Sequence, residues 1–237
     1  MLRAVFRAAL FFLVLLPENI LMKPLLLPTA YLPPVSWMAV ALKYQNISIE
    51  LHETYPKQTF RNRCNIATAN GILSLSIPVI KANGNHTQTC EILIDNSKNW
   101  QQLHWRSIIT AYNKSPYFLY YRDMIEPLYH KKHKNLVTLN QDFIITLFST
   151  LNIRTIKTHN TEEFIFEPDY LNLRNSFNPK KQPFQNLTEP LPRYMQVFEE
   201  IHGFIPDLSI IDLLFNLGPD ASAYLSNIEL SIPAETM

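Results

Sequence analysis

The sequence predicts an α/β fold: a single mixed-sheet domain with an aromatic-rich helical half. Three observations predict it. Apolar stretches of strand length fill much of the first hundred residues, whereas amphipathic stretches of helix length fill the middle and the end. The chain is 47% hydrophobic and 12% aromatic, which is ample for a packed core. Its 237 residues contain no internal repeat and no evident linker, and this length fits one domain or at most two.

The first predicted elements are a strand, a helix and a second strand. Residues 25–27 form a short apolar stretch that Pro28 ends, which indicates a buried strand. A pair of prolines then opens a helix over residues 35–44, because proline is tolerated in the first turn of a helix. Apolar and polar residues alternate over residues 47–51, the pattern of a half-buried strand.

A hairpin is predicted next. The Asn-Gly pair at residues 70–71 is typical of a two-residue turn, and it separates strands at residues 63–67 and 72–77. A second Asn-Gly pair at residues 83–84 marks another turn. Residues 90–94 are predicted as a further strand.

The helical half follows. A helix capped by Asp95 or Ser97 is predicted to run through residue 113, two more are predicted over residues 117–130 and 136–151, and a bend is expected at Pro127. A strand is predicted over residues 153–158. The proline-rich segment 167–192 is predicted to be irregular, and two closing helices, each stopped by a glycine, are predicted over residues 193–202 and 209–217.

Glycine is scarce in this chain, with four residues against seventeen prolines, whereas an average protein contains ~7% glycine. A phosphate-binding loop needs two or three clustered glycines so that backbone N–H groups can approach the phosphate. Each glycine here stands alone at a predicted turn or helix end. The sequence therefore excludes a Walker A loop and a dinucleotide fingerprint. Arginine side chains or helix N-termini would have to bind any phosphate.

Charge and cysteine content exclude further classes of protein. With 21 basic and 20 acidic residues, the formal net charge of +1 argues against a nucleic-acid partner. Two cysteines cannot build a disulfide framework or a four-cysteine metal site. No cofactor and no metal are predicted. The composition is typical of a reduced, cytoplasmic protein.

Residues 1–21 have three interpretations. Two arginines before an apolar run resemble a signal peptide, but no small-residue cleavage site follows. The run is too short for a stable membrane span, although a short membrane anchor stays open. The favoured interpretation is a misassigned start, with Met22 as the first residue of a domain over residues 22–237.

The densest polar cluster lies at residues 57–63. Arg61 and Arg63 are two residues apart, so on a strand they share a face and could hold one anion together. Asn62 would then point to the opposite face. The alternative is a solvated basic strand edge, which discourages pairing with another strand.

A histidine and several tyrosines are further candidates. His104 lies in a predicted amphipathic helix and is either a general base or a histidine with a purely structural role. Tyrosines suit the stacking of a sugar or a base, but at helical spacing they are more often core residues. The tyrosines concerned include Tyr31 and Tyr112.

Several strings of this sequence resemble those of the WbqC-like family. They are LLLPTAYLPPVSWM, KQTFRNRCNIATANG followed by LSIPV, WQQLHWRSIITAYNKSPYFLYYRD and HGFIPDLSIIDLLFNLGPDASAYL, and the resemblance runs from Met22 to about residue 225. The sequence departs from the family after the first strand, because Pro28-Thr29-Ala30 stands where many members have Gln-Pro. Any ligand contact of that Gln is therefore in doubt.

The resemblance implies a biosynthetic pathway class and a set of site residues. Members are associated with gene clusters for O-antigen and other surface polysaccharides, so it implies lipopolysaccharide or polysaccharide biosynthesis and a transferase role. Six residues match the recurring polar and aromatic positions of the family: Tyr31, Arg61, Asn62, Arg63, His104 and Tyr112.

Three functional hypotheses follow. The leading one is a cytoplasmic transferase that moves a small acyl or aminoacyl group to an activated sugar. In it, His104 is the base, and Arg61 and Arg63 bind phosphate or carboxylate. The alternatives are a nucleotidyltransferase-like enzyme that needs a nucleoside triphosphate, and a non-catalytic binding protein of a glycan assembly complex.

Overall fold

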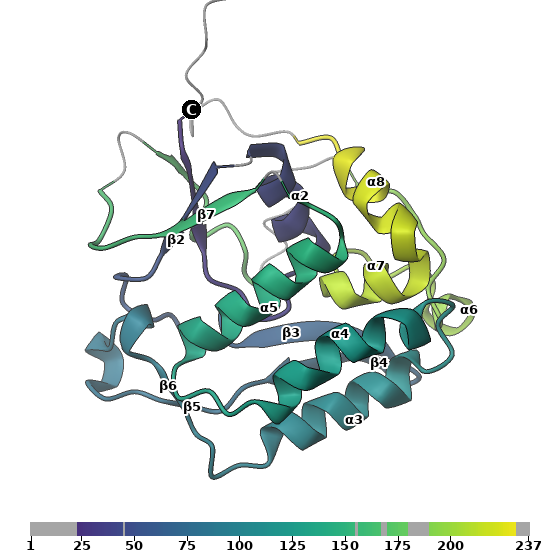
Figure 1. Ribbon diagram of the computed structural model, residues 1–237, viewed down its shortest axis with the longest axis horizontal. Helices are drawn as coiled ribbons and strands as arrows, with labels where there is room; N and C mark the ends of the chain where they lie inside the picture. Colours follow the sequence, from purple (N-terminus) through teal and green to yellow (C-terminus); the bar gives the residue numbers. More distant parts are fainter. Residues whose placement is uncertain (1–22, 45, 155, 167–169, 180–189, 231–237) are drawn as a thin grey trace, which may run out of the picture.

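The computed structural model describes residues 23–44, 46–154, 156–166, 170–179 and 190–230 (Figure 1). It confirms the α/β class, with a four-stranded parallel sheet, two small antiparallel sheets and a helical half that carries a cluster of aromatic rings. The predicted leader over residues 1–21 lies outside the described residues, as does much of the proline-rich segment 167–192.

The parallel sheet is built from strands that are far apart in sequence. They lie in the order β7-β2-β1-β8, and every pair of neighbours is parallel. The central strand β1 has no exposed leucine, as expected for a strand covered on both faces. All four carboxyl ends therefore meet at one edge. The strands are β1 (Leu25–Pro28), β2 (Asn46–Glu50), β7 (Lys157–Asn160) and β8 (Leu171–Asn172).

The predicted first helix and hairpin are both present. α2 (Val35–Tyr44) connects the parallel strands β1 and β2. The antiparallel strands β3 (Arg63–Thr68) and β4 (Gly71–Ser76) pair from end to end, from Arg63 opposite Ser76 to Thr68 opposite Gly71. Gly71 has a φ of 100°, which a residue with a side chain rarely adopts.

The predicted strand over residues 90–94 is shorter than expected. A 3-10 turn occupies Thr89–Glu91, where Cys90 N donates to Leu51 O and the Glu91 side chain accepts from Gln88 N. Only β6 (Leu93–Ile94) is extended, and it pairs with β5 (Val79–Ile80). The strand prediction was wrong for residues 90–92, because Cys90 bonds to Leu51 and the Glu91 side chain bonds to Gln88 in place of a strand ladder.

The helical half contains three long helices. They are α3 (Trp100–Tyr112), α4 (Phe118–His130), which includes Pro127, and α5 (Leu136–Thr150), which the Asn135 side chain caps. Figure 1 shows them below the parallel sheet, with α4 packed against both α3 and α5. Their buried aromatic rings contact one another, for example Trp105 with Phe118 and Tyr129.

The C-terminal region differs most from the prediction. The helix predicted over residues 193–202 is only α6 (Glu199–His202), because the side chains of Tyr194 and Gln196 turn inward and bond to Asp212. The strand predicted over residues 153–158 is displaced to β7, where it pairs with β2. The last helices are α7 (Ile210–Leu217) and α8 (Ala221–Ser226).

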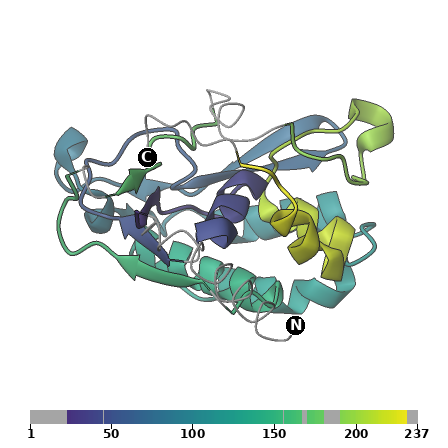
Figure 2. The ribbon, with the colours of Figure 1, turned by 90° about the horizontal axis from the view of Figure 1, so that it is seen from above.

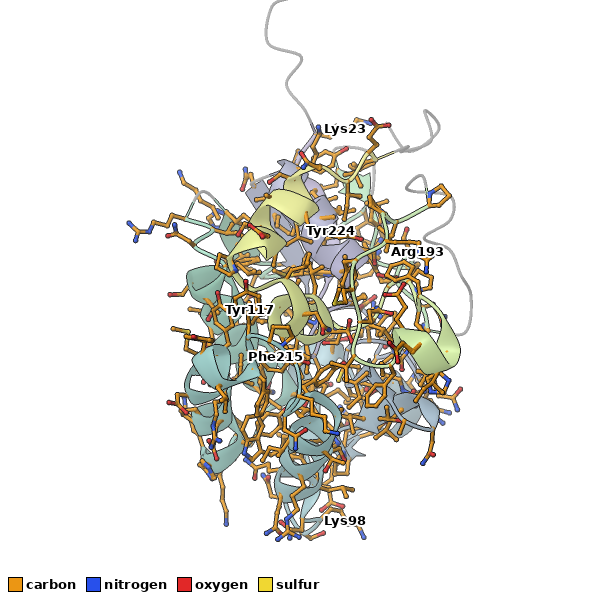
Figure 3. The ribbon with its side chains drawn as sticks, turned by 90° about the vertical axis from the view of Figure 1, so that its right-hand side faces the viewer. Lys23, Lys98, Tyr117, Arg193, Phe215 and Tyr224 are labelled. Carbon is orange, nitrogen blue, oxygen red and sulfur yellow. The ribbon has the colours of Figure 1, made fainter. Side chains whose placement is uncertain are left out.

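The end of α7 is packed against the start of α4. Tyr117 N donates to Phe215 O at 3.0 Å, and the two residues lie together in Figure 3. A Cβ on Gly218 would come within 2.5 Å of the Tyr117 ring, so this close approach requires glycine. Seen from above in Figure 2, α2, α7 and α8 lie between the β3–β4 hairpin and α5. None of the helices within the described residues has both the length and the apolar character needed to cross a membrane.

Candidate functional site

The carboxyl edge of the parallel sheet gathers polar side chains from all four strands. Ligands of open α/β sheets bind at this edge, because the loops that follow parallel strands meet there. Some of these side chains come from strand ends, others from the chain that follows β2 and from α5. We call this group the carboxyl-edge site, and it consists of Thr29, Glu50, Glu53, Tyr55, Arg61, Arg63, Asn140, Thr161 and Arg174.

Glu50, at the end of β2, is fully buried and fully bonded. Its Oε2 accepts from Arg174 Nη1 at 3.0 Å and from Ile165 N at 3.1 Å. Its Oε1 accepts from His52 N at 2.8 Å and from Thr161 Oγ1 at 3.1 Å. Four donors thus hold one carboxylate, and they come from the segments that follow β2, β7 and β8. Glu50 therefore links the three segments that follow these strands.

Glu53 and Arg61 form a second buried ion pair. Arg61 is 2% exposed, and its Nε donates to Glu53 Oε1 at 2.7 Å while its Nη2 donates to Arg174 O at 3.1 Å. Both guanidinium contacts to Glu53 use Oε1, and Oε2 accepts no hydrogen bond from the residues that the structure describes. Burial raises the pKa of Glu53, even though the Arg61 charge opposes the shift. Glu53 thus offers one unbonded oxygen with increased basicity.

Asn140 connects α5 to this pair. Its Nδ2 donates to Arg61 O at 2.8 Å and to Thr29 Oγ1 at 3.1 Å, so it links the loop after β1 to the turn that carries Arg61. The side chain is completely buried, and its Oδ1 has no partner among the described residues.

Unpartnered buried polar atoms are concentrated around Arg61. Such atoms are rare in native proteins, because an unmade buried hydrogen bond costs about 1–3 kcal/mol. The described residues contain ten of them, and four lie in or next to the carboxyl-edge site. Two of the four belong to donor groups, whereas the other two are acceptors. They are Tyr55 OH, Arg63 Nε, Asn62 Oδ1 and Asn140 Oδ1.

Of the predicted 61–63 cluster, Arg61 and Arg63 belong to this site and Asn62 lies next to it, but the two arginines do not share one strand face. β3 begins at Arg63, so Arg61 lies in the preceding turn. Burial raises the pKa of the Tyr55 phenol, and the charges of both arginines oppose this shift. Asn62 extends the hairpin by exchanging two 2.8 Å hydrogen bonds with Ile77, one of them from its Nδ2.

Tyr31 and His104 lie elsewhere, in a second buried group. Tyr31 OH is 3.0 Å from His104 Nδ1 and 2.6 Å from Tyr129 OH, and we call these three residues the Tyr31 network. Burial lowers the pKa of His104 to about 4, although a hydrogen bond with the Ser76 backbone opposes the shift. The imidazole is therefore neutral at pH 7. Cys64 lies close to Tyr31 and Tyr129.

The Tyr31 network faces away from Arg63. Neighbouring residues of a strand point to opposite faces, so Arg63 lies on the face of β3 opposite Cys64. His104 instead contributes to the lining of a surface hollow of about 520 Å3, together with Trp100, Lys98 and Arg106. No residue of the carboxyl-edge site lines that hollow.

Tyr112 belongs to a third group. Its OH donates to Asp212 Oδ2 at 2.8 Å and accepts from Ala67 N at 3.3 Å. Asp212 Oδ1 accepts from Tyr194 OH at 2.7 Å and from Gln196 Nε2 at 3.2 Å, and burial raises the pKa of Asp212. We call Tyr112, Tyr194, Gln196 and Asp212 the Asp212 network. The structure thus divides the six predicted site residues among three places.

The comparison with known families decides the identification. The model of the WbqC-like protein family matches residues 29–170, which is more than half of the chain. This chain belongs to the WbqC-like family. It is also 28% identical over 194 residues to an uncharacterized protein, Rv1507c, of Mycobacterium tuberculosis (strain ATCC 25618 / H37Rv), covering 72% of this chain and 83% of the relative. No solved structure matches this chain.

Most of the carboxyl-edge site lies within the WbqC-like match, from Thr29 to Thr161, whereas Arg174 lies beyond it. Sequence reasoning missed Glu50, Glu53 and Asn140 as members of this site. A signal for Glu53 was present, because polar residues shortly after a predicted strand indicate a carboxyl-edge position. Nothing in the sequence near Asn140 marks it, since its partners are 79 and 111 residues away.

Proposed function

We propose that this protein is a transferase that acts on an activated sugar in the biosynthesis of O-antigen or another surface polysaccharide, by moving a small acyl or aminoacyl group. The family resemblance supports the setting. One observation supports the site: an unbonded oxygen of the buried Glu53 lies in the same cluster as two buried donors without partners, Tyr55 OH and Arg63 Nε.

Binding of an anionic group of the substrate is assigned to Arg63 rather than to Arg61. The Arg61 guanidinium is already occupied by Glu53 and by Arg174 O, so its role is to hold the carboxylate in place. Arg63 forms no ion pair with any described residue, and its Nε lacks a partner. A guanidinium of this kind suits a phosphate or a carboxylate, which accepts two parallel hydrogen bonds.

Proton transfer is assigned to Glu53. As the accepting hydroxyl or amine attacks the carbonyl carbon of the acyl donor, its proton passes to Glu53 Oε2. The proton then passes to the leaving group as the bond between carbonyl carbon and leaving group breaks. A carboxylate whose pKa is raised by burial is a more effective base than an exposed one.

His104 as the base stays a prediction. Its Nδ1 lies against Tyr31 OH, and its pKa of about 4 makes the neutral imidazole a weak proton acceptor. A role at the carboxyl-edge site would also require it to act from the other face of the hairpin. For these reasons the proposal uses Glu53.

Thermal unfolding with a panel of nucleotide sugars tests the proposal. We expect at least one nucleotide sugar to raise the melting temperature of the unsubstituted protein, called the parent. The control Arg154→Ala changes an exposed arginine outside the site and should show the same rise. The same ligand should leave Arg63→Ala unshifted. No shift with any nucleotide sugar, or an equal shift in Arg63→Ala, would overturn the proposal.

Turnover separates the alternatives. Transfer of an acyl or aminoacyl group, followed by mass spectrometry of the sugar product, supports the proposed reaction. A requirement for a nucleoside triphosphate would favour the nucleotidyltransferase alternative, which the parallel β1–α2–β2 unit also fits. Ligand binding without turnover of any kind would favour the non-catalytic binding protein.

A further inference from the structure

Two lysines lie beside the carboxyl-edge site, and one of them is fixed on Tyr55. Lys81 directly follows β5, and its Nζ lies 4.8 Å from the centre of the Tyr55 ring. The same Nζ donates to Tyr55 O at 3.4 Å. A cation over the face of an aromatic ring is attracted to it. Tyr55 thus holds the Lys81 ammonium at the border of the site.

Lys57, an exposed residue two positions after Tyr55, contributes a second positive charge. Burial and the neighbouring Lys57 charge together lower the pKa of Lys81. Lys57, Arg63 and Lys81 form no ion pair with a carboxylate among the described residues. Both acidic side chains of the site are already paired, Glu53 with Arg61 and Glu50 with Arg174. Positive charge therefore accumulates here without compensation.

Two buried polar atoms of this group can donate hydrogen bonds. Tyr55 is only 4% exposed, yet its OH has no partner, and Arg63 Nε is likewise buried and unpartnered. Burial raises the pKa of the Tyr55 phenol, and the charges of Arg61 and Arg63 oppose the shift. The turn that follows Lys57 contains Gln58 with a φ of 60°, a strained backbone conformation of the kind that is retained at ligand sites.

These contacts point to an oxygen-rich anion. The guanidinium and the two ammonium groups supply donors only and the phenol hydroxyl can donate as well, whereas a phosphoryl group supplies several acceptor oxygens with up to two negative charges. A carboxylate ligand would match only one charge and two oxygens. The scarcity of glycine agrees with this arrangement, because side chains rather than a glycine-rich loop would surround the phosphate.

We propose that Tyr55, Lys57, Arg63 and Lys81 form a subsite for a phosphoryl group of the substrate. The identity of that substrate as an activated sugar rests on the proposed function, whereas the subsite itself rests on the contacts above. The subsite would hold the diphosphate of a nucleotide sugar so that the sugar projects toward Glu53.

Calorimetric titration with inorganic pyrophosphate tests the subsite without assuming a sugar. We expect pyrophosphate to bind the full chain, and Lys81→Gln and Lys57→Gln each to weaken binding about 10-fold, a typical loss for one charged contact. Lys114→Gln, which removes an exposed lysine between α3 and α4, is the matched control and should bind like the parent. Affinity should also fall as salt concentration rises.

The outcomes separate the two proposals. Absence of pyrophosphate binding, or equal affinity in Lys81→Gln and the parent, overturns the subsite. If pyrophosphate binds with the expected variant pattern but no nucleotide sugar does, the subsite stands and the proposed function fails. If a nucleotide sugar binds parent and Lys81→Gln equally well, the proposed function stands and the subsite fails. Unchanged circular dichroism of both lysine variants shows that folding is not the cause.

Discussion

The carboxyl-edge site and the buried networks of the helical half use the same kinds of residue in opposite ways. In the Asp212 network, every named tyrosine hydroxyl and both carboxylate oxygens have partners within the protein. In the Tyr31 network, the Tyr31 hydroxyl lies between a tyrosine and a histidine. The carboxyl-edge site, by contrast, retains buried donors without partners and cations without counter-charges.

The difference shows how a functional site is recognised among buried polar groups. Burial and shifted pKa values occur in all three places, so neither property singles out a site. A closed network contributes to stability, since its groups satisfy one another. The unpartnered groups of an open site gain partners only when a ligand binds, so that substitutions of those groups should affect ligand binding and turnover more than folding.

The largest expected effect is that of Glu53→Gln on turnover. Removing a general base typically lowers the rate about 10²–10⁴-fold. The amide oxygen of glutamine can still accept from Arg61, so pyrophosphate affinity should stay within about threefold of the parent. Turnover with a nucleotide sugar that shifts the melting temperature measures the first effect, and calorimetry measures the second.

Glu162→Gln is the control for this variant, because Glu162 is exposed in the segment after β7. It should retain the parent rate. Turnover of Glu53→Gln close to that of the parent would remove Glu53 from the mechanism, and the carboxyl-edge site would then be a binding site only.

A smaller effect is expected from acid on the Tyr31 network. The pKa of His104 is depressed from 6.5 to about 4, so between these pH values the unfolded chain binds more protons than the folded one. Stability from this group is therefore complete above pH 6.5 and is lost as the pH falls toward 4. The shift corresponds to about 3 kcal/mol.

Urea unfolding of the unsubstituted protein and of His104→Gln at several pH values measures this loss. Burial raises the pKa of Asp207 to about 7, so this group makes the folded state more stable as the pH falls. Asp207 is present in both proteins, and its contribution cancels when their free energies of unfolding are subtracted. If the free energies of unfolding of the two proteins changed in parallel with pH, His104 would not be held neutral by the fold. A fall in turnover of 10²-fold or more in His104→Gln would instead restore His104 as the base.

Much of the fold could be predicted from local signals. The proline pair before α2, the Asn-Gly turn of the hairpin and the helical periodicity of residues 136–151 each act within a few residues, and the corresponding elements are present. The start of α6 could not be predicted in this way. Tyr194 leaves the helical path because its hydroxyl bonds to Asp212, 18 residues further on.

The site was predictable only in part, for the same physical reason. The sequence marks Arg61 and Arg63 as cations, but it does not show that Arg61 is neutralised by Glu53 while Arg63 is not. That outcome depends on which loops the sheet order β7-β2-β1-β8 brings together. Arg174, for example, meets Glu50 from 124 positions away.

A matched pair of substitutions tests the comparison most directly: Tyr55→Phe at the carboxyl-edge site and Tyr112→Phe in the Asp212 network. Both remove one hydroxyl from a nearly or completely buried ring. Tyr112→Phe leaves Asp212 Oδ2 and Ala67 N without a partner and should lower the free energy of unfolding by about 2 kcal/mol. It should leave pyrophosphate affinity unchanged.

Tyr55→Phe removes a hydroxyl that has no partner, so its free energy of unfolding should stay within about 0.5 kcal/mol of the parent or rise. Its affinity for pyrophosphate should fall about 3- to 10-fold. Urea unfolding and calorimetry on the two variants give both quantities. Equal destabilisation of the two proteins, with unchanged pyrophosphate binding in Tyr55→Phe, would contradict the assignment of the carboxyl edge as the functional site.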